Sequence, residues 1–222
     1  MTAAPLDSDF LFQAMMAPPL TRPEHRPRAW RLDTPLAQIY EIPGMLSRRE
    51  CRELIEAIDR NLERSKTAKG ISDHRTSQTC YLAYWEPDLA ARIDRRCAEL
   101  IGIDPIYSDP LQGQRYEPGQ SYGGHTDWFS PDDPVARDQL IPLGQRTWTV
   151  MIYLNAVEEG GQTIFHRLGR RFEPLPGVAL AWNNLHADGR GNPYTLHGSL
   201  KVVRGVKYII TKWFRQHPRS AD

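Results

Sequence analysis

The sequence predicts a mainly β fold with helices in the N-terminal part of the chain. Helical periodicity and helix-capping residues are concentrated before Gly102, whereas short β-like runs separated by Gly, Pro, Asn and Asp follow it. Helices and strands therefore occupy separate parts of the chain instead of alternating. This order favours a β sandwich or barrel supported by N-terminal helices over a fold built on a parallel sheet.

The composition is typical of a globular protein and excludes several classes. Of the 222 residues, 40% are hydrophobic and 25% are charged, and 28 Lys+Arg against 27 Asp+Glu give a net charge of +1. This balance provides no global positive field for nucleic acid. No apolar run approaches the roughly 18 residues of a membrane span, and we recognise no signal peptide. Three cysteines without CxxC spacing indicate neither disulfides nor a thiolate zinc site, so we expect a cytoplasmic protein.

The chain is expected to form one domain preceded by an arm. Prolines and arginines are interspersed near the N-terminus, which is typical of an extended, solvated segment. We assign residues 1–35 to this arm and 36–222 to a single domain. Within the domain, residues 36–105 are expected to be a helical support region and 106–216 the β core.

The support region is predicted to contain a strand and two helices. The strand is expected over residues 36–42. Ser47 with Glu50 three residues later forms a capping-box signature, and apolar residues recur at helical spacing over 51–62. A second helix is predicted over 87–101, because a proline stands in its first turn and a glycine follows its end.

The region after Gly102 is predicted to be a succession of strands. The β-like runs cover residues 112–116, 122–129, 147–154, 163–166, 178–182, 194–200 and 206–214. The interval 130–143 contains several prolines and aspartates, and we interpret it as a loop. Loops of this kind often act as lids over a substrate.

A candidate metal site is formed by three residues of these runs. His125 and Asp127 are two positions apart, so on a strand they project from the same face. A lone His-x-Asp pair is weak evidence, but His197 could complete the set from a neighbouring strand. Two histidines and one carboxylate leave positions open on an octahedral ion, which suits non-haem Fe(II) and its need to hold substrate and O₂ together.

A second candidate lies on the last run, where Lys207 shares a face with Ile209, Thr211 and Trp213. Both faces of this run are largely apolar, so the lysine is expected to be buried. An unpartnered buried ammonium is costly. We therefore expect an anionic ligand beside Lys207.

At this point the sequence resembles the Fe(II)/2-oxoglutarate dioxygenases, and among them the prolyl 4-hydroxylase branch. The resemblance runs from about residue 40 to residue 215 and is densest at 75–77, 114–127, 144–149, 153–155, 159–165, 196–198 and 205–213. It implies a double-stranded β-helix (jelly-roll) core, with His125, Asp127 and His197 as iron ligands and catalytic residues. It also implies that Lys207 pairs with the C5 carboxylate of 2-oxoglutarate.

The same resemblance implies roles for further residues. Tyr116 and Thr163 would line the co-substrate pocket, with Tyr116 as a hydrogen-bond donor. The positions that match the substrate groove are Arg75, Ser77, Asp109, Tyr122, Arg146 and Trp213. The sequence departs from the family pattern at Trp128, Gln162 and His166, which leaves the substrate in doubt. His166 is a candidate for substrate contact, whereas His74 is expected to be a solvated loop residue.

The implied activity is hydroxylation of a proline in a peptide or protein, coupled to oxidative decarboxylation of 2-oxoglutarate to succinate and CO₂. O₂ is the co-substrate, and ascorbate is the implied reductant. The same chemistry on a free amino acid or small metabolite is an alternative, favoured if the 130–143 loop closes the pocket.

The same residues disfavour functions of other classes. A nucleic-acid repair dioxygenase is disfavoured because Lys207 replaces the arginine usual in that branch. A cupin-like or 2-oxoglutarate-sensing binding module is disfavoured by Asp127 and by the complete triad. Regiochemistry and oligomeric state, a homodimer included, are left open.

Overall fold

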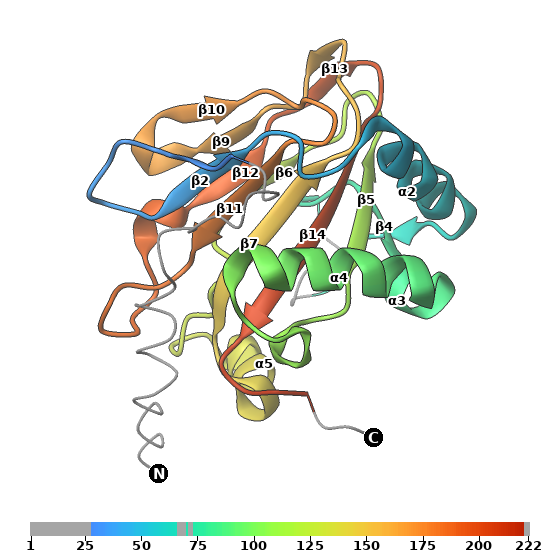
Figure 1. The fold of residues 1–222 in the computed structure, drawn as a ribbon. Coiled ribbons are helices and arrows are strands. Elements are labelled where there is room, and N and C mark those ends of the chain that lie inside the picture. The colour runs from blue at the N-terminus through green and yellow to red at the C-terminus, as the bar shows by residue number, and fades with distance from the viewer. Residues whose placement is uncertain (1–27, 66–69, 71–72, 220–222) are drawn as a thin grey trace.

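The computed structural model describes residues 28–65, 70 and 73–219, so most of the expected N-terminal arm lies outside the described residues. The described part contains three antiparallel sheets (Figure 1). The largest has eight strands in the order β1-β2-β11-β7-β14-β5-β4-β3. These strands are β1 (Trp30–Arg31), β2 (Ile39–Ile42), β3 (Glu63–Arg64), β4 (Gln78–Tyr81), β5 (Gln112–Tyr116), β7 (Arg146–Tyr153), β11 (Ala179–Asn183) and β14 (Lys207–Arg215).

A second, smaller sheet has four strands in the order β10-β9-β12-β6. Its strands are β6 (Tyr122–His125), β9 (Thr163–Phe165), β10 (Arg170–Phe172) and β12 (His197–Ser199). A third sheet pairs β8 (Glu159–Gly160) with β13 (Val202–Arg204). Connections that cross between the two larger sheets, such as β5 to β6 and β11 to β12, are those of a double-stranded β-helix, the predicted core.

Helices α2 (Arg48–Arg60) and α4 (Pro87–Ile101) cover one face of the eight-stranded sheet (Figure 1). The predicted capping box begins α2, because the Ser47 backbone N–H donates to the Glu50 carboxylate at 2.8 Å and the Ser47 side chain accepts from the Glu50 backbone. Gly102 ends α4 with a φ of 82°, a conformation that glycine adopts readily. The remaining helical segments are α3 (Leu82–Trp85), α5 (Pro134–Leu143), η1 (Pro105–Tyr107), η2 (His166–Leu168) and η3 (Pro193–Thr195).

The two faces of the large sheet pack into two separate cores. On β7, Val150 and Ile152 face the helices and join the larger core. The alternate residues Met151 and Tyr153 face the smaller sheet and join a second core, which includes Phe165 of β9. Period-two alternation thus gives every central strand one face against the helices and one face toward the space between the sheets. The candidate site lies in that space.

Three sequence-based expectations are corrected by the structure. Residues 130–143 are not only a loop, since α5 occupies 134–143: Pro134 stands in its first turn, where proline is tolerated. The strand predicted over 122–129 ends at His125, so Asp127 lies beyond β6. Strand β1 falls within the expected arm but pairs with β2.

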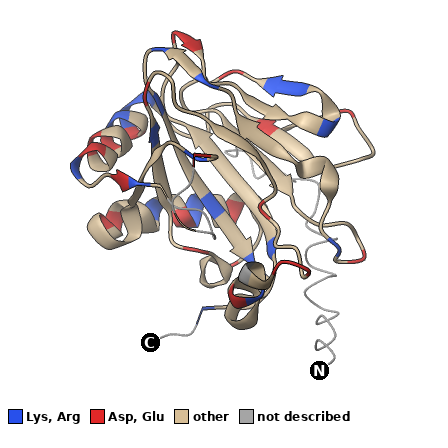
Figure 2. Ribbon diagram, turned by 180° about the vertical axis from the view of Figure 1, so that it is seen from behind, with Lys and Arg blue, Asp and Glu red and all other residues tan. Residues whose placement is uncertain are grey.

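The surface carries charges of both signs. Figure 2 shows Lys and Arg interspersed with Asp and Glu over the helices and outer loops, while the strands are mostly uncharged. This agrees with the net charge of +1. Among the described residues, no helix has the length and apolar character needed to span a bilayer.

Candidate active site

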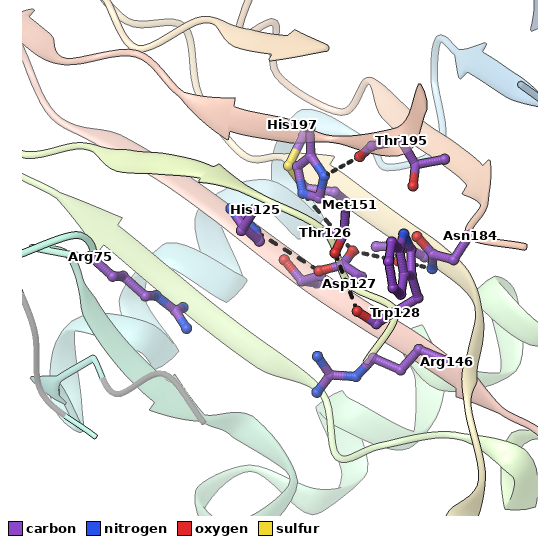
Figure 3. A network of polar contacts seen from close by, with 12 residues as sticks. Arg75, His125, Thr126, Asp127, Trp128, Arg146, Met151, Asn184, Thr195 and His197 are labelled. Atoms are coloured by element: carbon purple, nitrogen blue, oxygen red, sulfur yellow. Dashed lines mark hydrogen bonds and ion pairs between the residues drawn. The ribbon is translucent and has the colours of Figure 1, made fainter. Parts of the chain in front are cut away.

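Two histidines and one aspartate converge between the sheets (Figure 3). His125 ends β6, His197 begins β12, and the two residues are paired directly across these strands. The Nε2 atom of His125 lies 3.9 Å from Oδ1 of Asp127, and Nε2 of His197 lies 3.9 Å from Oδ2 of the same carboxylate. One nitrogen or oxygen atom from each residue lies within 4.8 Å of the other two. The three side chains therefore surround one point.

Backbone carbonyls orient both imidazole rings. Nδ1–H of His125 donates to the carbonyl of Gly123 at 2.9 Å, and Nδ1–H of His197 donates to the carbonyl of Thr195 at 2.9 Å. With the proton on Nδ1, each Nε2 directs its lone pair toward the common point. Burial lowers the pKa of His125 to about 3, with the neighbouring His197 as the second-largest cause. The His125 ring is therefore neutral near pH 7.

A chain of buried hydrogen bonds orients the carboxylate. Thr149 donates its hydroxyl to Oδ2 of Asp127 at 2.6 Å, and Asn184 donates its amide to the Thr149 hydroxyl at 2.9 Å. The indole N–H of Trp182 donates to the Asn184 carbonyl oxygen at 3.0 Å. Burial opposes ionisation of Asp127, yet its pKa is lowered, with His197 as the largest favourable contribution. The carboxylate is thus charged and held in one orientation.

This set of donors fits Fe(II). Two imidazole nitrogens and one carboxylate oxygen on one side of a point form the two-histidine, one-carboxylate arrangement of non-haem Fe(II) oxygenases. The ligands leave the opposite side open for other molecules. The supporting hydrogen bonds from Thr149, Gly123 and Thr195 are the kind that hold metal ligands in place.

Lys207 lies in the same cavity and is fully buried, with 0% of its surface exposed. Its Nζ donates to the Ser199 hydroxyl at 2.8 Å and lies 5.3 Å from the centre of the Tyr116 ring. Desolvation lowers the pKa of Lys207 to about 7. Thr163 and Tyr116, each 2% exposed, line the cavity beside it. A carboxylate bound here would stabilise the charged ammonium form of Lys207, which burial alone disfavours.

The other side of the cavity carries two arginines. The guanidinium of Arg75 lies 4.9 Å from the centre of the Tyr122 ring, and this ring in turn stacks on His125 at a centroid distance of 3.6 Å. The guanidinium of Arg146 lies 4.1 Å from the centre of the Trp213 ring. All five side chains line the cavity. The arginines therefore lie beside the triad with each guanidinium group over an aromatic ring.

Two of the predicted substrate residues, Asp109 and Ser77, lie outside the cavity lining and contact the arginines. Asp109 does not line the cavity; its Oδ2 lies 2.9 Å from both Nε and Nη2 of Arg146 and so fixes that guanidinium. Ser77 is also outside the lining, and its hydroxyl accepts from Nε of Arg75 at 3.3 Å. Each of these two residues therefore contacts a predicted substrate-binding arginine and does not face the cavity.

Several lining residues were missed by sequence reasoning, His74 and Trp128 among them. The ring of His74 packs edge-on against Tyr122 at 5.9 Å, and Trp128 lines the cavity while its indole N–H donates to the Asn192 carbonyl at 3.1 Å. Both are adjacent in sequence to predicted site residues, which was the available signal. His166, a candidate for substrate contact, is exposed and does not line the cavity.

The cavity has a volume of about 900 Å³. It includes the triad, Lys207 and both arginines, and the segment 130–143 contributes Ser130, Asp133, Ala136 and Gln139 to its lining. This volume lies at the upper end of the roughly 300–1,000 Å³ typical of pockets for small molecules. Space therefore remains beyond what a small dicarboxylate at Lys207 would occupy.

Comparison with known proteins places this site in a family. The sequence model of the 2OG-Fe(II) oxygenase superfamily matches residues 111–215. Prolyl 4-hydroxylase 2 of Arabidopsis thaliana is 31% identical over 215 residues, covering 85% of this chain and 69% of that protein. The human prolyl 4-hydroxylase subunit alpha-1 is 33% identical over 143 residues, covering 64% of this chain and 27% of the subunit.

A solved structure has the same fold. The viral collagen prolyl hydroxylase of Paramecium bursaria Chlorella virus-1, in its 2-oxoglutarate complex, superposes with a TM-score of 0.64 at 27% identity, covering 80% of this chain and 95% of that chain. The double-stranded β-helix and the His-Asp-His cluster agree with this likeness. The chain belongs to the 2OG-Fe(II) oxygenase superfamily and is a 2-oxoglutarate-dependent dioxygenase of the prolyl 4-hydroxylase type.

Proposed function

We propose that this protein hydroxylates proline residues in peptides or proteins, with His125, Asp127 and His197 as the iron ligands and Lys207 as the 2-oxoglutarate anchor. The observation that carries the proposal is a single cavity that holds the triad, a buried lysine and two ring-stacked arginines. The named activity of the Arabidopsis and human relatives supports the substrate class.

The residues near Lys207 select the co-substrate. The Lys207 ammonium pairs with the distal carboxylate, and the Ser199 hydroxyl keeps Nζ directed into the cavity at 2.8 Å. Tyr116 and Thr163 close the sides of this pocket and exclude water, which strengthens the ion pair. Iron and 2-oxoglutarate, when bound, supply the oxygen-activating chemistry that converts a C–H bond into an alcohol, with succinate and CO₂ as products.

The residues on the opposite side orient the substrate. Arg146 is fixed by Asp109 and stacked on Trp213, so its remaining donors are presented in one direction. Arg75 is fixed in the same way on Tyr122. Donors held in this manner bind peptide carbonyl oxygens at little cost in side-chain entropy and place the target carbon near the triad.

A peptide is favoured over a free amino acid by the size of the cavity. Its volume of about 900 Å³ exceeds the needs of 2-oxoglutarate and a single amino acid together. The alternative rests on one observation: α5 lines part of the cavity and could close over a small molecule.

The test is to supply the purified protein with Fe(II), 2-oxoglutarate, O₂ and either a proline-containing peptide or free proline. We expect peptide-dependent succinate formation and a product heavier by one oxygen atom on proline. Succinate formation that responds only to the free amino acid would favour the small-molecule alternative. The cytoplasmic location and the use of ascorbate stay predictions.

A further inference from the structure

Lys212 on β14 is a buried charge outside the cavity. Its side chain is 0% exposed and does not line the cavity, whereas its neighbours Thr211 and Trp213 do. Its strand partner Val150 belongs to the core between the large sheet and the helices, so Lys212 points toward the helices. Desolvation lowers the pKa of the Lys212 ammonium, and Asp94 opposes this shift. A charge kept in such a place requires partners.

Two oxygen atoms bind the Lys212 ammonium. Nζ lies 2.7 Å from Oδ2 of Asp94, on α4, and donates to the backbone carbonyl of Asp109 at 2.8 Å. Helix α4 lies against β14 at this point (Figure 1). The other oxygen of Asp94, Oδ1, is buried and has no hydrogen-bond partner among the described residues. A buried ion pair with an incompletely satisfied partner adds little stability compared with apolar residues of similar volume, so stability does not explain the pair.

The second contact of Lys212 fixes the backbone of Asp109. This residue lies between η1 and β5, so the regular pairing of a strand does not hold it. Its N–H donates to the carbonyl of Trp213 at 2.9 Å, and its carbonyl accepts from Nζ of Lys212. Two consecutive residues of β14 therefore hold both backbone polar groups of Asp109.

The carboxylate of Asp109 carries this constraint to the cavity. Its Oδ2 lies 2.9 Å from both Nε and Nη2 of Arg146, so the carboxylate sets the direction of that guanidinium. The ring of Trp213 supports the same guanidinium at 4.1 Å. Lys212 and Trp213 are adjacent on β14 and point to opposite faces of the sheet. Trp213 thus acts on Arg146 directly, and Lys212 acts on it through Asp109.

We propose that Lys212 is a positioning residue for the substrate: through Asp109 it holds the Arg146 guanidinium in the orientation that binds the peptide. We call Asp94, Lys212, Asp109 and Arg146 the Lys212 relay, which runs from α4 across the eight-stranded sheet to the cavity. The inference rests on the proposed function, in which Arg146 orients the peptide. It gives a role at the site to a charge that lies on the helix side of the sheet.

Loss of the ammonium should disturb the substrate and not the co-substrate. Without Lys212 the Asp109 carbonyl loses this donor, and the Asp109 carboxylate shifts with its backbone. A displacement of about 1 Å can cost roughly a hundredfold in rate, so a smaller shift of Arg146 should raise the peptide KM about tenfold. A misplaced peptide is hydroxylated less often, so succinate should form in excess over hydroxylated product. Lys207 donates to Ser199, outside the relay, and the dissociation constant of 2-oxoglutarate should be unchanged.

Three variants separate positioning from stability. Lys212→Met removes the ammonium and leaves Asp94 beside an apolar side chain, so its Tm should fall. The double variant Asp94→Leu/Lys212→Met removes both charges and should recover a Tm near that of the wild type. The control Arg92→Met/Glu53→Leu removes an exposed pair, 2.8 Å apart, that joins the same helix to α2.

The Tm, the KM and kcat for a proline-containing peptide, and the ratio of succinate to hydroxylated product are measured for each variant. We expect the double variant to keep the raised peptide KM and the excess of succinate although its Tm has recovered. The control should match the wild type in peptide KM and in product ratio. Recovery of the KM together with the Tm in the double variant, or equal KM effects of the relay and control variants, would overturn the proposal.

A second readout requires no substrate. The Nε–H of Arg146, which donates to Asp109 at 2.9 Å, gives an NMR signal that Arg146→Lys removes and so assigns. We expect this proton to exchange with water about tenfold faster in the double variant and at an unchanged rate in the control. An unchanged rate in the double variant would refute the relay. Failure of the proposed function gives a different pattern: the wild type hydroxylates no peptide, while the exchange rate at Arg146 still depends on Lys212.

Discussion

Replacement of Lys207 by alanine should weaken 2-oxoglutarate binding steeply and leave metal binding largely intact. Lys207 is fully buried, and its nearest polar partner is the neutral hydroxyl of Ser199. A carboxylate bound there without the ammonium would be a buried, unpaired charge, which costs roughly 3–5 kcal/mol. Since about 1.4 kcal/mol is a factor of ten, the dissociation constant should rise by roughly a hundred- to a thousandfold or more.

The wild-type protein should also bind 2-oxoglutarate less tightly as the pH rises. Desolvation lowers the pKa of Lys207 to about 7 before the ligand binds, and the bound carboxylate raises this pKa again. Below pH 7 the ammonium is already present. Above pH 7 binding must take up a proton, so the affinity falls by up to about tenfold per pH unit until the pH passes the pKa of the complex.

Calorimetric titration of 2-oxoglutarate into Mn(II)-loaded protein measures both effects, with the exposed Lys201→Ala as control. We expect Lys201→Ala to match the wild type and Lys207→Ala to lose both affinity and pH dependence. An unchanged affinity in Lys207→Ala, or an equal loss of Mn(II) binding, would refute the assigned role of this lysine.

The remaining predictions concern metal affinity, stability and substrate binding. Thr149→Val removes the hydroxyl that donates to Asp127 at 2.6 Å, so competition with a chelator should show a metal affinity about 10- to 100-fold lower. Thr149→Ser should restore the affinity. An unchanged affinity in Thr149→Val would contradict the role of this hydroxyl in orienting Asp127. Gly113→Ala places a Cβ 2.4 Å from Cγ1 of the fully buried Ile58 on α2. The free energy of unfolding should therefore fall by about 1–3 kcal/mol, and the Tm should fall with it. An unaltered Tm would mean that α2 can move away from the sheet without cost. Arg146→Lys keeps the charge but loses the guanidinium contacts with Asp109 and Trp213. The peptide KM should rise about tenfold, which corresponds to the loss of one charge-assisted hydrogen bond of ~1.5 kcal/mol. An unchanged KM would exclude contact between Arg146 and the substrate.

Local patterns in the sequence predicted much of the fold. The capping box at Ser47 and Glu50 begins α2 as expected, because both partners lie within one turn. The alternation along β14 also holds: Lys207, Ile209 and Thr211 line the cavity, whereas the intervening residues face the helices. These features depend on neighbouring residues only, and the sequence contains that information directly.

Features that depend on distant residues were harder to predict. The pairing of His197 with His125 joins two strands far apart in the chain. The residue pattern offered His197 only as a possible third ligand, and the resemblance to a family made the assignment specific. Strand β4, at 78–81, is short and partly polar, so no alternation pointed to it. Asp109 was expected in the substrate groove, but its backbone N–H donates to the Trp213 carbonyl at 2.9 Å, a contact between residues far apart in the chain, and its carboxylate pairs with Arg146.

The central claim is that the triad holds iron in a form that binds 2-oxoglutarate, and anaerobic visible absorption tests it most directly. Purified protein with Fe(II) is compared before and after addition of 2-oxoglutarate, with His197→Ala as the matched variant. The account predicts a metal-to-ligand charge-transfer band that appears only with the keto acid and is absent from the variant. Bound iron without a band in the wild type, or an equal band in His197→Ala, would contradict it.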